Sequence, residues 1–220
     1  MNIDMLKRAV KGSVISHSER DFGTIKDALI WNGRKSGRTP QLVVRAESAA
    51  DVQAAVRFAD DNGLRVSARG SGHHFALLSM QEGVLIDLSR LNSLDIDTAT
   101  STSRVGPTLT NGELAAALGK ADLAFPVGHC ASVSLSGYLL GGGLGWNSGA
   151  WGIACHNVLE VEVVLADGSL VTASDTQNPD IFWAVRGAGP EFFGIVTSYR
   201  LRLQPMPRAI RTSVWTYPLQ

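Results

Sequence analysis

Two short stretches of the sequence combine glycines with nucleophilic side chains. The first, Arg-Gly-Ser-Gly-His-His at 69–74, follows an apolar run typical of a strand and ends in His73 and His74. In the second, Gly128 lies two positions before Cys130. A glycine turn after a strand can present backbone N–H groups to a phosphate, because glycine lets the backbone approach closely. Imidazole nitrogen and thiolate sulfur can both form covalent bonds with an electrophile.

Taken singly, each stretch also has a simpler interpretation. Gly70-x-Gly72 lacks the third glycine of a dinucleotide-binding fingerprint, so alone it indicates an ordinary tight turn. Adjacent histidines are more often structural than metal ligands. The nearby histidines and cysteines, at 129, 130, 155 and 156, do not have zinc-site spacing, and we expect no metal. Cysteine is often a small buried hydrophobe, although Cys130 follows a glycine in a loop and does not belong to an apolar stripe.

The composition indicates a globular protein. The chain has 220 residues, 45% hydrophobic and 18% charged, which is enough to bury a core in one large domain or two small ones. The formal net charge is zero, so nothing favours a nucleic acid or an anionic membrane as partner. No apolar run approaches the ~20 residues of a membrane span. The charged N-terminus is a poor signal peptide and two cysteines are too few for a disulfide framework, so we expect a soluble, cytoplasmic protein.

Periodicity places the first stretch at the end of a β-α-β unit. A short strand is expected at 41–45, and Ser48-x-x-Asp51 has the pattern of a capping box at the start of a helix. Asn62-Gly63 ends that helix, and the strand at 64–68 leads into the glycine turn. A helical crossover predicts that the two strands are parallel.

The rest of the chain predicts an α+β fold with two lobes. Strands are expected at 84–88, 91–97, 101–106 and 194–203, a hairpin at 158–174, and helices at 25–30, 113–120, 133–140 and 180–186. Thr110 or Asn111 caps the second of these helices, and the last should bury Phe182 and Trp183. We expect an N-terminal segment at 1–37, a small parallel lobe at 38–98 and a larger lobe with antiparallel pairs at 99–207. Residues 208–220 are predicted to begin a further, truncated domain.

Three segments in sequence order resemble one family. They are RGSGHH at 69–74, PVGHC followed by SGYLLGGGLGW at 126–146, and FWAVRGAGP with FFGIVT at 182–197. Together they resemble the PCMH-type FAD-binding domain of the vanillyl-alcohol-oxidase family, in the branch of berberine bridge enzyme and the oligosaccharide oxidases. The resemblance covers residues from about 32 to 204. Three motifs in the same order are far more specific than any one of them.

The resemblance implies a covalently bound FAD. The turn starting at Arg69 would bind the pyrophosphate, His73 would bond to the flavin C8 methyl group and Cys130 to flavin C6. Cys155, Trp183 and Arg186 would be structural. The cofactor contacts it implies are Arg69, Gly70, Ser71, Gly72, His73, His74, Gly128, Cys130, Val133, Ser134, Gly137, Gly143, Gly145, Ile195 and Val196.

The resemblance also implies an FAD-dependent oxidoreductase that oxidises an alcohol, a sugar or an amine. A small residue at Val133 accompanies oxygen reactivity in this branch, so molecular oxygen is the expected acceptor. The catalytic base would come from a substrate domain outside this chain. Two alternatives stay open: a flavin-binding module inactive without that domain, and a non-covalent FAD reductase or dehydrogenase on the same scaffold.

Overall fold

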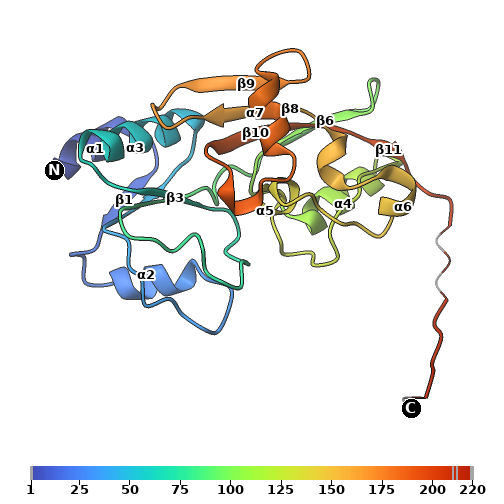
Figure 1. Cartoon of the computed structure of the whole chain (residues 1–220), viewed down its shortest axis with the longest axis horizontal. Helices are drawn as coiled ribbons and strands as arrows, with labels where there is room; N and C mark the ends of the chain where they lie inside the picture. Colours follow the sequence, from blue (N-terminus) through green and yellow to red (C-terminus); the bar gives the residue numbers. More distant parts are fainter. Residues whose placement is uncertain (1, 210, 212, 219–220) are drawn as a thin grey trace.

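The computed structural model describes residues 2–209, 211 and 213–218, and its first sheet contains the predicted β-α-β unit (Figure 1). The strand order is β1-β2-β4-β3. The strands are β1 (Ser13–Ser16), β2 (Leu42–Arg45), β3 (Val66–Arg69) and β4 (Val84–Asp87). β2 and β3 both run parallel to β4, which lies between them, while β1 adds an antiparallel edge. The predicted parallel orientation is confirmed, but the two strands are not neighbours, because β4 is inserted between them.

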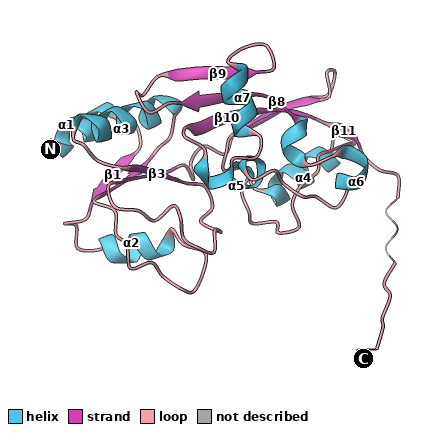
Figure 2. Ribbon diagram, viewed as in Figure 1, coloured by secondary structure: helices cyan, strands magenta, loops and turns pink. Residues whose placement is uncertain are grey.

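Helices cover both faces of this sheet. Alternate residues of β2 and β4, such as Val44 and Ile86, contact the cluster formed by α1 (Ile3–Ala9) and α3 (Ala49–Asp61). Val43 and Leu85 point to the other face and pack with α2 (Phe22–Ala28). Figure 2 shows the helices on opposite sides of the strands. A sheet buried on both faces explains why these strands read as continuous apolar runs.

Asp51 joins the N-terminal segment to the start of α3. Ser48 caps the helix as predicted, because its hydroxyl accepts from the Asp51 N–H at 3.2 Å. The buried Asp51 carboxylate, however, does not complete a capping box. It accepts from the N–H groups of Lys11 and Gly12, each at 3.0 Å, and of Glu47 at 2.9 Å. Residues 1–37 therefore belong to the first lobe, which they complete with α1, β1 and α2.

The second sheet is antiparallel throughout, with the strand order β5-β6-β10-β8-β9. The strands are β5 (Leu94–Asp97), β6 (Thr102–Val105), β8 (Val158–Val164), β9 (Leu170–Ser174) and β10 (Ile195–Arg202). β5 lies in this sheet, although the predicted lobe boundary near residue 98 assigned it to the first one. The short β7 (Leu123–Ala124) and β11 (Gln204–Pro205) form a separate pair.

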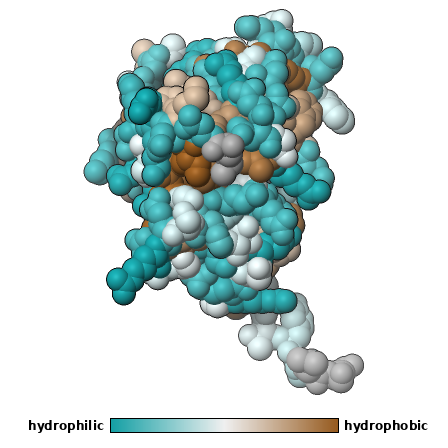
Figure 3. All heavy atoms as spheres, turned by 90° about the vertical axis from the view of Figure 1, so that its left-hand side faces the viewer, coloured by the Kyte–Doolittle hydropathy of each residue, from teal (hydrophilic) through white to brown (hydrophobic). Residues whose placement is uncertain are grey.

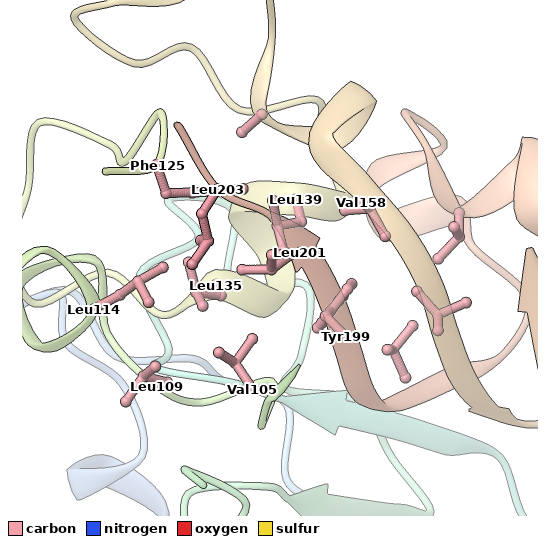
Figure 4. Packing of buried hydrophobic residues seen from close by; sticks show 14 of the residues in the cluster. Val105, Leu109, Leu114, Phe125, Leu135, Leu139, Val158, Tyr199, Leu201 and Leu203 are labelled. Carbon is pink, nitrogen blue, oxygen red and sulfur yellow. The ribbon is translucent and has the colours of Figure 1, made fainter. Parts of the chain in front are cut away.

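The core of the second lobe lies between this sheet and its helices (Figure 4). Leu135 and Leu139 of α5 (Leu135–Leu140) pack with Tyr199 and Leu201 of β10. α4 (Asn111–Gly119) starts after Thr110, which forms a full capping box with Glu113 and so decides between the two predicted caps. The remaining helical elements are α6 (Ser148–Trp151), η1 (Ala154–Asn157), α7 (Pro179–Val185) and η2 (Gly189–Glu191).

One residue of α7 that was predicted to be buried is exposed. Phe182 is buried as expected, but Trp183 is 77% exposed. Successive residues of a helix point about 100° apart, so a surface helix that buries Phe182 and Val185 turns Trp183 outward. Arg186 supports the helix, since its guanidinium lies 4.2 Å from the centre of the Phe182 ring. Cys155 is buried, as predicted.

Side chains of α3 fasten the two lobes together. Gln53 Nε2 and Arg57 Nη2 donate to the Gly168 carbonyl, in the turn between β8 and β9, at 2.7 and 2.9 Å. Val164 and Ile195 of the second sheet belong to the same apolar cluster as α3. The lobes are thus held at a fixed separation along one side.

The surface is largely polar and the C-terminal segment is irregular. Figure 3 shows the end with the N-terminus, which is mostly hydrophilic around an apolar strip. None of the described helices is long and apolar enough to cross a bilayer. The described residues between 208 and 218 form no helix or strand, while 210, 212, 219 and 220 lie outside the described residues, and the further domain expected to begin at 208 stays a prediction.

Candidate functional site

A cleft runs between β3 of the first lobe and β10 with η2 of the second. It consists of two adjoining cavities of about 420 and 660 Å³ that share wall residues such as Ala68, Leu140 and Ile195. Ten of the predicted contact residues surround the smaller cavity: Gly70, Ser71, Gly72, His73, His74, Val133, Ser134, Gly137, Ile195 and Val196. Two lobes and three distant motifs therefore meet at one site.

The glycine turn is pressed tightly against its surroundings. A Cβ atom at Gly70 would overlap the Ser136 hydroxyl and lie 2.7 Å from Ser134 Oγ. Gly72 has φ +73°, and a Cβ there would overlap the Leu29 carbonyl oxygen. Gly72 needs glycine for space and for its backbone angle, whereas at Gly70 the two serine hydroxyls would have to rotate away.

Arg69 supports the turn from behind and does not line the cleft. Its guanidinium donates to Asp87 Oδ1 at 3.1 Å, to the Leu29 carbonyl at 3.0 Å and to the Ser71 carbonyl at 3.3 Å. Asp87 is the register partner of Arg69 across β3 and β4, and it is buried and also paired with Arg45 at 3.6 Å. Asp87 thus holds the Arg69 guanidinium away from the two cavities, and the predicted contact of Arg69 with the pyrophosphate stays a prediction.

His73 and Cys130 are joined through Ser132. The Ser132 hydroxyl lies 3.2 Å from His73 Nε2 and 3.4 Å from Cys130 Sγ. A turn closed by the Val133 N–H and the Cys130 carbonyl, 3.2 Å apart, directs Ser132 back toward the thiol. Trp31 stacks on the other side of the imidazole, with ring centres 4.6 Å apart. Sequence reasoning missed Ser132, whose only local signal was a hydroxyl two positions after the cysteine.

The surroundings of both nucleophiles favour their reactive forms. Hydrogen bonding by Ser132 lowers the pKa of the exposed Cys130 thiol below its ordinary value, which raises its thiolate fraction. Partial burial, and to a smaller extent the Arg69 charge, lower the pKa of His73, although its hydrogen bond with Ser132 acts in the opposite direction. A lower pKa leaves more of the imidazole neutral at neutral pH, with a lone pair on one nitrogen.

Three of the predicted glycines have packing roles outside the cleft. The Gly128 N–H donates to Asn111 Oδ1 at 2.8 Å, which fixes the loop before Cys130. A Cβ at Gly143 would lie 2.8 Å from the Tyr138 ring, and one at Gly145 2.8 Å from the backbone of 126–127. Close loop packing therefore accounts for glycine at 143 and 145, and neither residue lines the two cavities, while their predicted cofactor contacts stay predictions.

Tyr138 is a structural residue at the wall of the cleft. Its hydroxyl donates to the Pro126 carbonyl at 2.5 Å. Burial raises its pKa to about 12, so it stays protonated at neutral pH. It anchors the 126–128 loop and has no acid–base role in this arrangement.

The cleft fits an elongated ligand with polar groups. Among the described residues, Ser67 is the one buried side chain whose oxygen has no hydrogen-bond partner, and it lines the larger cavity. A buried hydroxyl without a partner is costly, and rotation of the Ser67 side chain into the cavity would let a bound polar group satisfy it. The Gly70–Gly72 turn opens to the smaller cavity, where a backbone without side chains allows a phosphate to approach. No cluster of three or more metal-ligating side chains is present in the described part of the chain.

Comparison with known proteins identifies the domain. The model of the FAD binding domain family matches residues 40–174. The chain is 38% identical to (R)-6-hydroxynicotine oxidase of Paenarthrobacter nicotinovorans, over 95% of this chain and 45% of that protein. It is 34% identical to xylooligosaccharide oxidase of Thermothelomyces thermophilus, over 93% of this chain and 41% of that protein. The chain thus spans less than half the length of these relatives.

Solved structures agree in fold. Wild-type Phl p 4.0202, described as a glucose dehydrogenase, superposes with a TM-score of 0.86 at 29% identity and covers 93% of this chain and 44% of its own. A Phl p 4 variant with one isoleucine replaced by valine has the same TM-score and is described as a glucose oxidase. The two-lobed α+β architecture is therefore that of known flavoprotein structures, which confirms the resemblance drawn from the three motifs.

Proposed function

Because the chain belongs to the FAD binding domain family, we propose that it is the flavin-holding part of an oxidase whose FAD is attached to both His73 and Cys130. Its relatives are FAD-linked oxidases and oxidoreductases, and the chain matches less than half of their length. The activity therefore belongs to the whole protein, while this domain binds the cofactor and places its reactive end.

The observation that carries the proposal is the bridge through Ser132. His73 and Cys130 are far apart in the sequence, yet one hydroxyl lies within hydrogen-bond distance of both. His73 lines the smaller cavity, and the shared hydroxyl places Cys130 beside it, so both nucleophiles can attach to one ring system in that cavity. The remainder of the cofactor would occupy the two cavities, past the Gly70–Gly72 turn and toward Ser67.

The two attachments balance with oxygen as the electron acceptor. Each replaces a C–H hydrogen of the flavin and an N–H or S–H hydrogen of the protein by one covalent bond. Two protons and two electrons leave for every bond formed, and reduction of oxygen to hydrogen peroxide accounts for them. The neutral imidazole and the acidified thiol supply the electron pairs.

When bound, the flavin accepts a hydride from the substrate and passes the electrons to an acceptor. The names of the relatives support a small polar substrate, because they specify a hydroxynicotine, a xylooligosaccharide and glucose. We propose an alcohol or amine carbon of such a molecule as the hydride donor. The chain's own residues hold the cofactor, and Trp31 and Ser132 fix the His73 ring.

Val133 is proposed to admit oxygen to the flavin. It lines the smaller cavity three residues after Cys130. The Phl p 4 pair supports a valine in this role, since one isoleucine-to-valine change separates a dehydrogenase from an oxidase. One added methyl group can close a path of molecular dimensions in a packed site. Val133→Ile should slow reoxidation of the photoreduced flavin by oxygen about tenfold or more, without slowing reoxidation by a dye. Equal oxygen rates in stopped-flow traces would exclude this role.

The covalent linkage is tested by acid precipitation of the holoprotein. The wild-type pellet should stay yellow, and so should the pellets of His73→Ala and Cys130→Ala, each through the remaining bond. The double variant should release all of its FAD into the supernatant. His74→Ala and His129→Ala are matched controls, because each removes an imidazole next to an attachment residue without removing an attachment. A colourless wild-type pellet from flavin-loaded protein would contradict the proposal.

A further inference from the structure

His73, Ser132 and Cys130 form a short chain of hydrogen bonds with the hydroxyl in the middle. The two heavy-atom distances, 3.2 Å to Nε2 and 3.4 Å to Sγ, are those of real hydrogen bonds for these elements. A serine hydroxyl has one hydrogen to donate and can accept at the same time. The donors and acceptors in this series of hydrogen bonds can therefore be arranged in two opposite directions. Each direction fixes the protonation of the Cys130 thiol and the tautomer of the His73 imidazole.

In the first direction the Cys130 thiol donates to Ser132 and Ser132 donates to Nε2. The hydrogen of the neutral imidazole is then on Nδ1, and neither end is a nucleophile. In the second direction Nε2–H donates to Ser132 and Ser132 donates to a Cys130 thiolate. Nδ1 then carries a lone pair and the sulfur carries a charge, so both ends are nucleophiles.

The two directions differ by one proton. The Nδ1 hydrogen leaves to solvent, while the thiol proton moves to Ser132 and the Ser132 proton moves to Nε2. No electrons are transferred. The loss of one proton thus makes both His73 and Cys130 nucleophilic, although they lie on different segments of the polypeptide.

We propose that Ser132 is the positioning residue that couples the thiolate state of Cys130 to the Nδ1 lone pair of His73, so that both become reactive together. This inference rests on the proposed attachment of FAD to these two residues. Ser132 itself forms no bond to the cofactor. Its hydrogen bonds determine when His73 and Cys130 are in the protonation states that can form such bonds.

The other polar and charged groups near His73 and Cys130 are paired or stacked elsewhere, so they do not link these two residues. His73 is stacked on Trp31, and the nearby Arg69 charge is paired with Asp87. His129, next to Cys130, is stacked on Trp146 with ring centres 4.0 Å apart. Cys155 is buried, so it does not share the ionisation of Cys130. The Ser132 hydroxyl is the group in hydrogen-bond contact with both nucleophiles.

The first test follows the alkylation of Cys130 by iodoacetamide against pH, on protein purified without flavin and read by peptide mass spectrometry. The reaction midpoint should rise by about one pH unit in Ser132→Ala, which corresponds to the loss of one hydrogen bond to the thiolate. Ser132→Thr keeps the hydroxyl and should restore the wild-type midpoint, and His129→Ala should not change it. Coincident profiles for wild type and Ser132→Ala, or no restoration by Ser132→Thr, would overturn the inference.

The second test measures the rate of covalent FAD attachment at His73 by peptide mass spectrometry. With Cys130 present, Ser132→Ala should slow this attachment about tenfold, because nothing then links the Nδ1 lone pair to the thiolate, whereas in the Cys130→Ala background, where the thiolate is already absent, adding Ser132→Ala should slow it much less. An unchanged rate with Cys130 present would overturn the coupling. If all wild-type flavin is extractable while Ser132→Ala still shifts the Cys130 midpoint, the covalent attachment fails and the hydrogen-bonded coupling stands.

Discussion

Gly72→Ala is expected to destabilise the turn that carries His73, for two separate reasons. Gly72 has φ +73°, and the left-handed region costs a residue with a side chain about 1–2 kcal/mol. The new Cβ would also overlap the Leu29 carbonyl oxygen, which accepts a hydrogen bond from Arg69 Nε at 3.0 Å. Displacing that carbonyl removes about 1 kcal/mol more. The sum is about 2–3 kcal/mol.

The loss should appear in the thermal unfolding of the flavin-free protein. For a chain of this size each kcal/mol lowers Tm by about 2–4 °C, so Gly72→Ala should unfold about 4–12 °C below wild type. Flavin is left out because a bound ligand would stabilise the folded state by mass action.

Gly23→Ala is the matched control. Gly23 lies in α2, in the same lobe, and a Cβ there would meet nothing within 4 Å. Its Tm should equal that of wild type or exceed it slightly, because alanine is the better helix former. A Gly72→Ala Tm equal to that of wild type, or a similar loss in Gly23→Ala, would refute the reasoning about the turn.

Two further predictions concern buried carboxylates. Asp87→Asn removes the carboxylate charge that pairs with both Arg69 and Arg45, and it should lower the free energy of unfolding in urea titrations by about 2–4 kcal/mol. The control Ser89→Ala removes only one hydrogen bond to Asp87 and should lower the free energy of unfolding by about 1 kcal/mol. Burial would raise the pKa of Asp51, but its hydrogen bonds outweigh this and lower the pKa below 3.8. Its contribution is therefore complete above that value and lost as the pH falls below it, so urea midpoints between about pH 5 and pH 2 should fall more steeply in wild type than in Asp51→Asn.

The sequence predicted the features that rest on local signals. Thr110, one of the two predicted caps, begins α4, and the predicted hairpin of β8 and β9 turns near Asp167-Gly168. The three motifs identified the family because each has a fixed internal spacing and all three occur in the same order along the sequence as in that family. These signals lie within short segments and do not depend on the rest of the fold.

The features that were missed depend on contacts between distant segments. β4 enters the sheet between β2 and β3, which no local pattern indicates, and this places Asp87 opposite Arg69. The guanidinium is therefore turned from the cleft toward a buried carboxylate. Trp183 was expected inside because tryptophan is large and apolar, but the orientation of α7 decides its exposure.

The sequence predicted most of the residues that line the site, but it did not predict the hydrogen bonds that connect them. His73 and the residues around Ser134 and Ile195 lie at one cleft, as the motifs implied. Ser132 was missed because its role appears only when the turn at 130–133 meets the turn at 69–74. Residue type alone does not show that a glycine such as Gly143 is also required for close packing against Tyr138.

The central claim, that FAD is attached to both His73 and Cys130, is tested most directly by a trypsin digest of the denatured holoprotein. Cleavage after Arg69 and Arg90 isolates the peptide 70–90, and cleavage after Lys120 and Arg186 isolates the peptide 121–186. The account predicts one flavin-containing species in which both peptides are joined through FAD, with fragment ions that place the modifications at His73 and Cys130. Two unmodified peptides together with free FAD would contradict it.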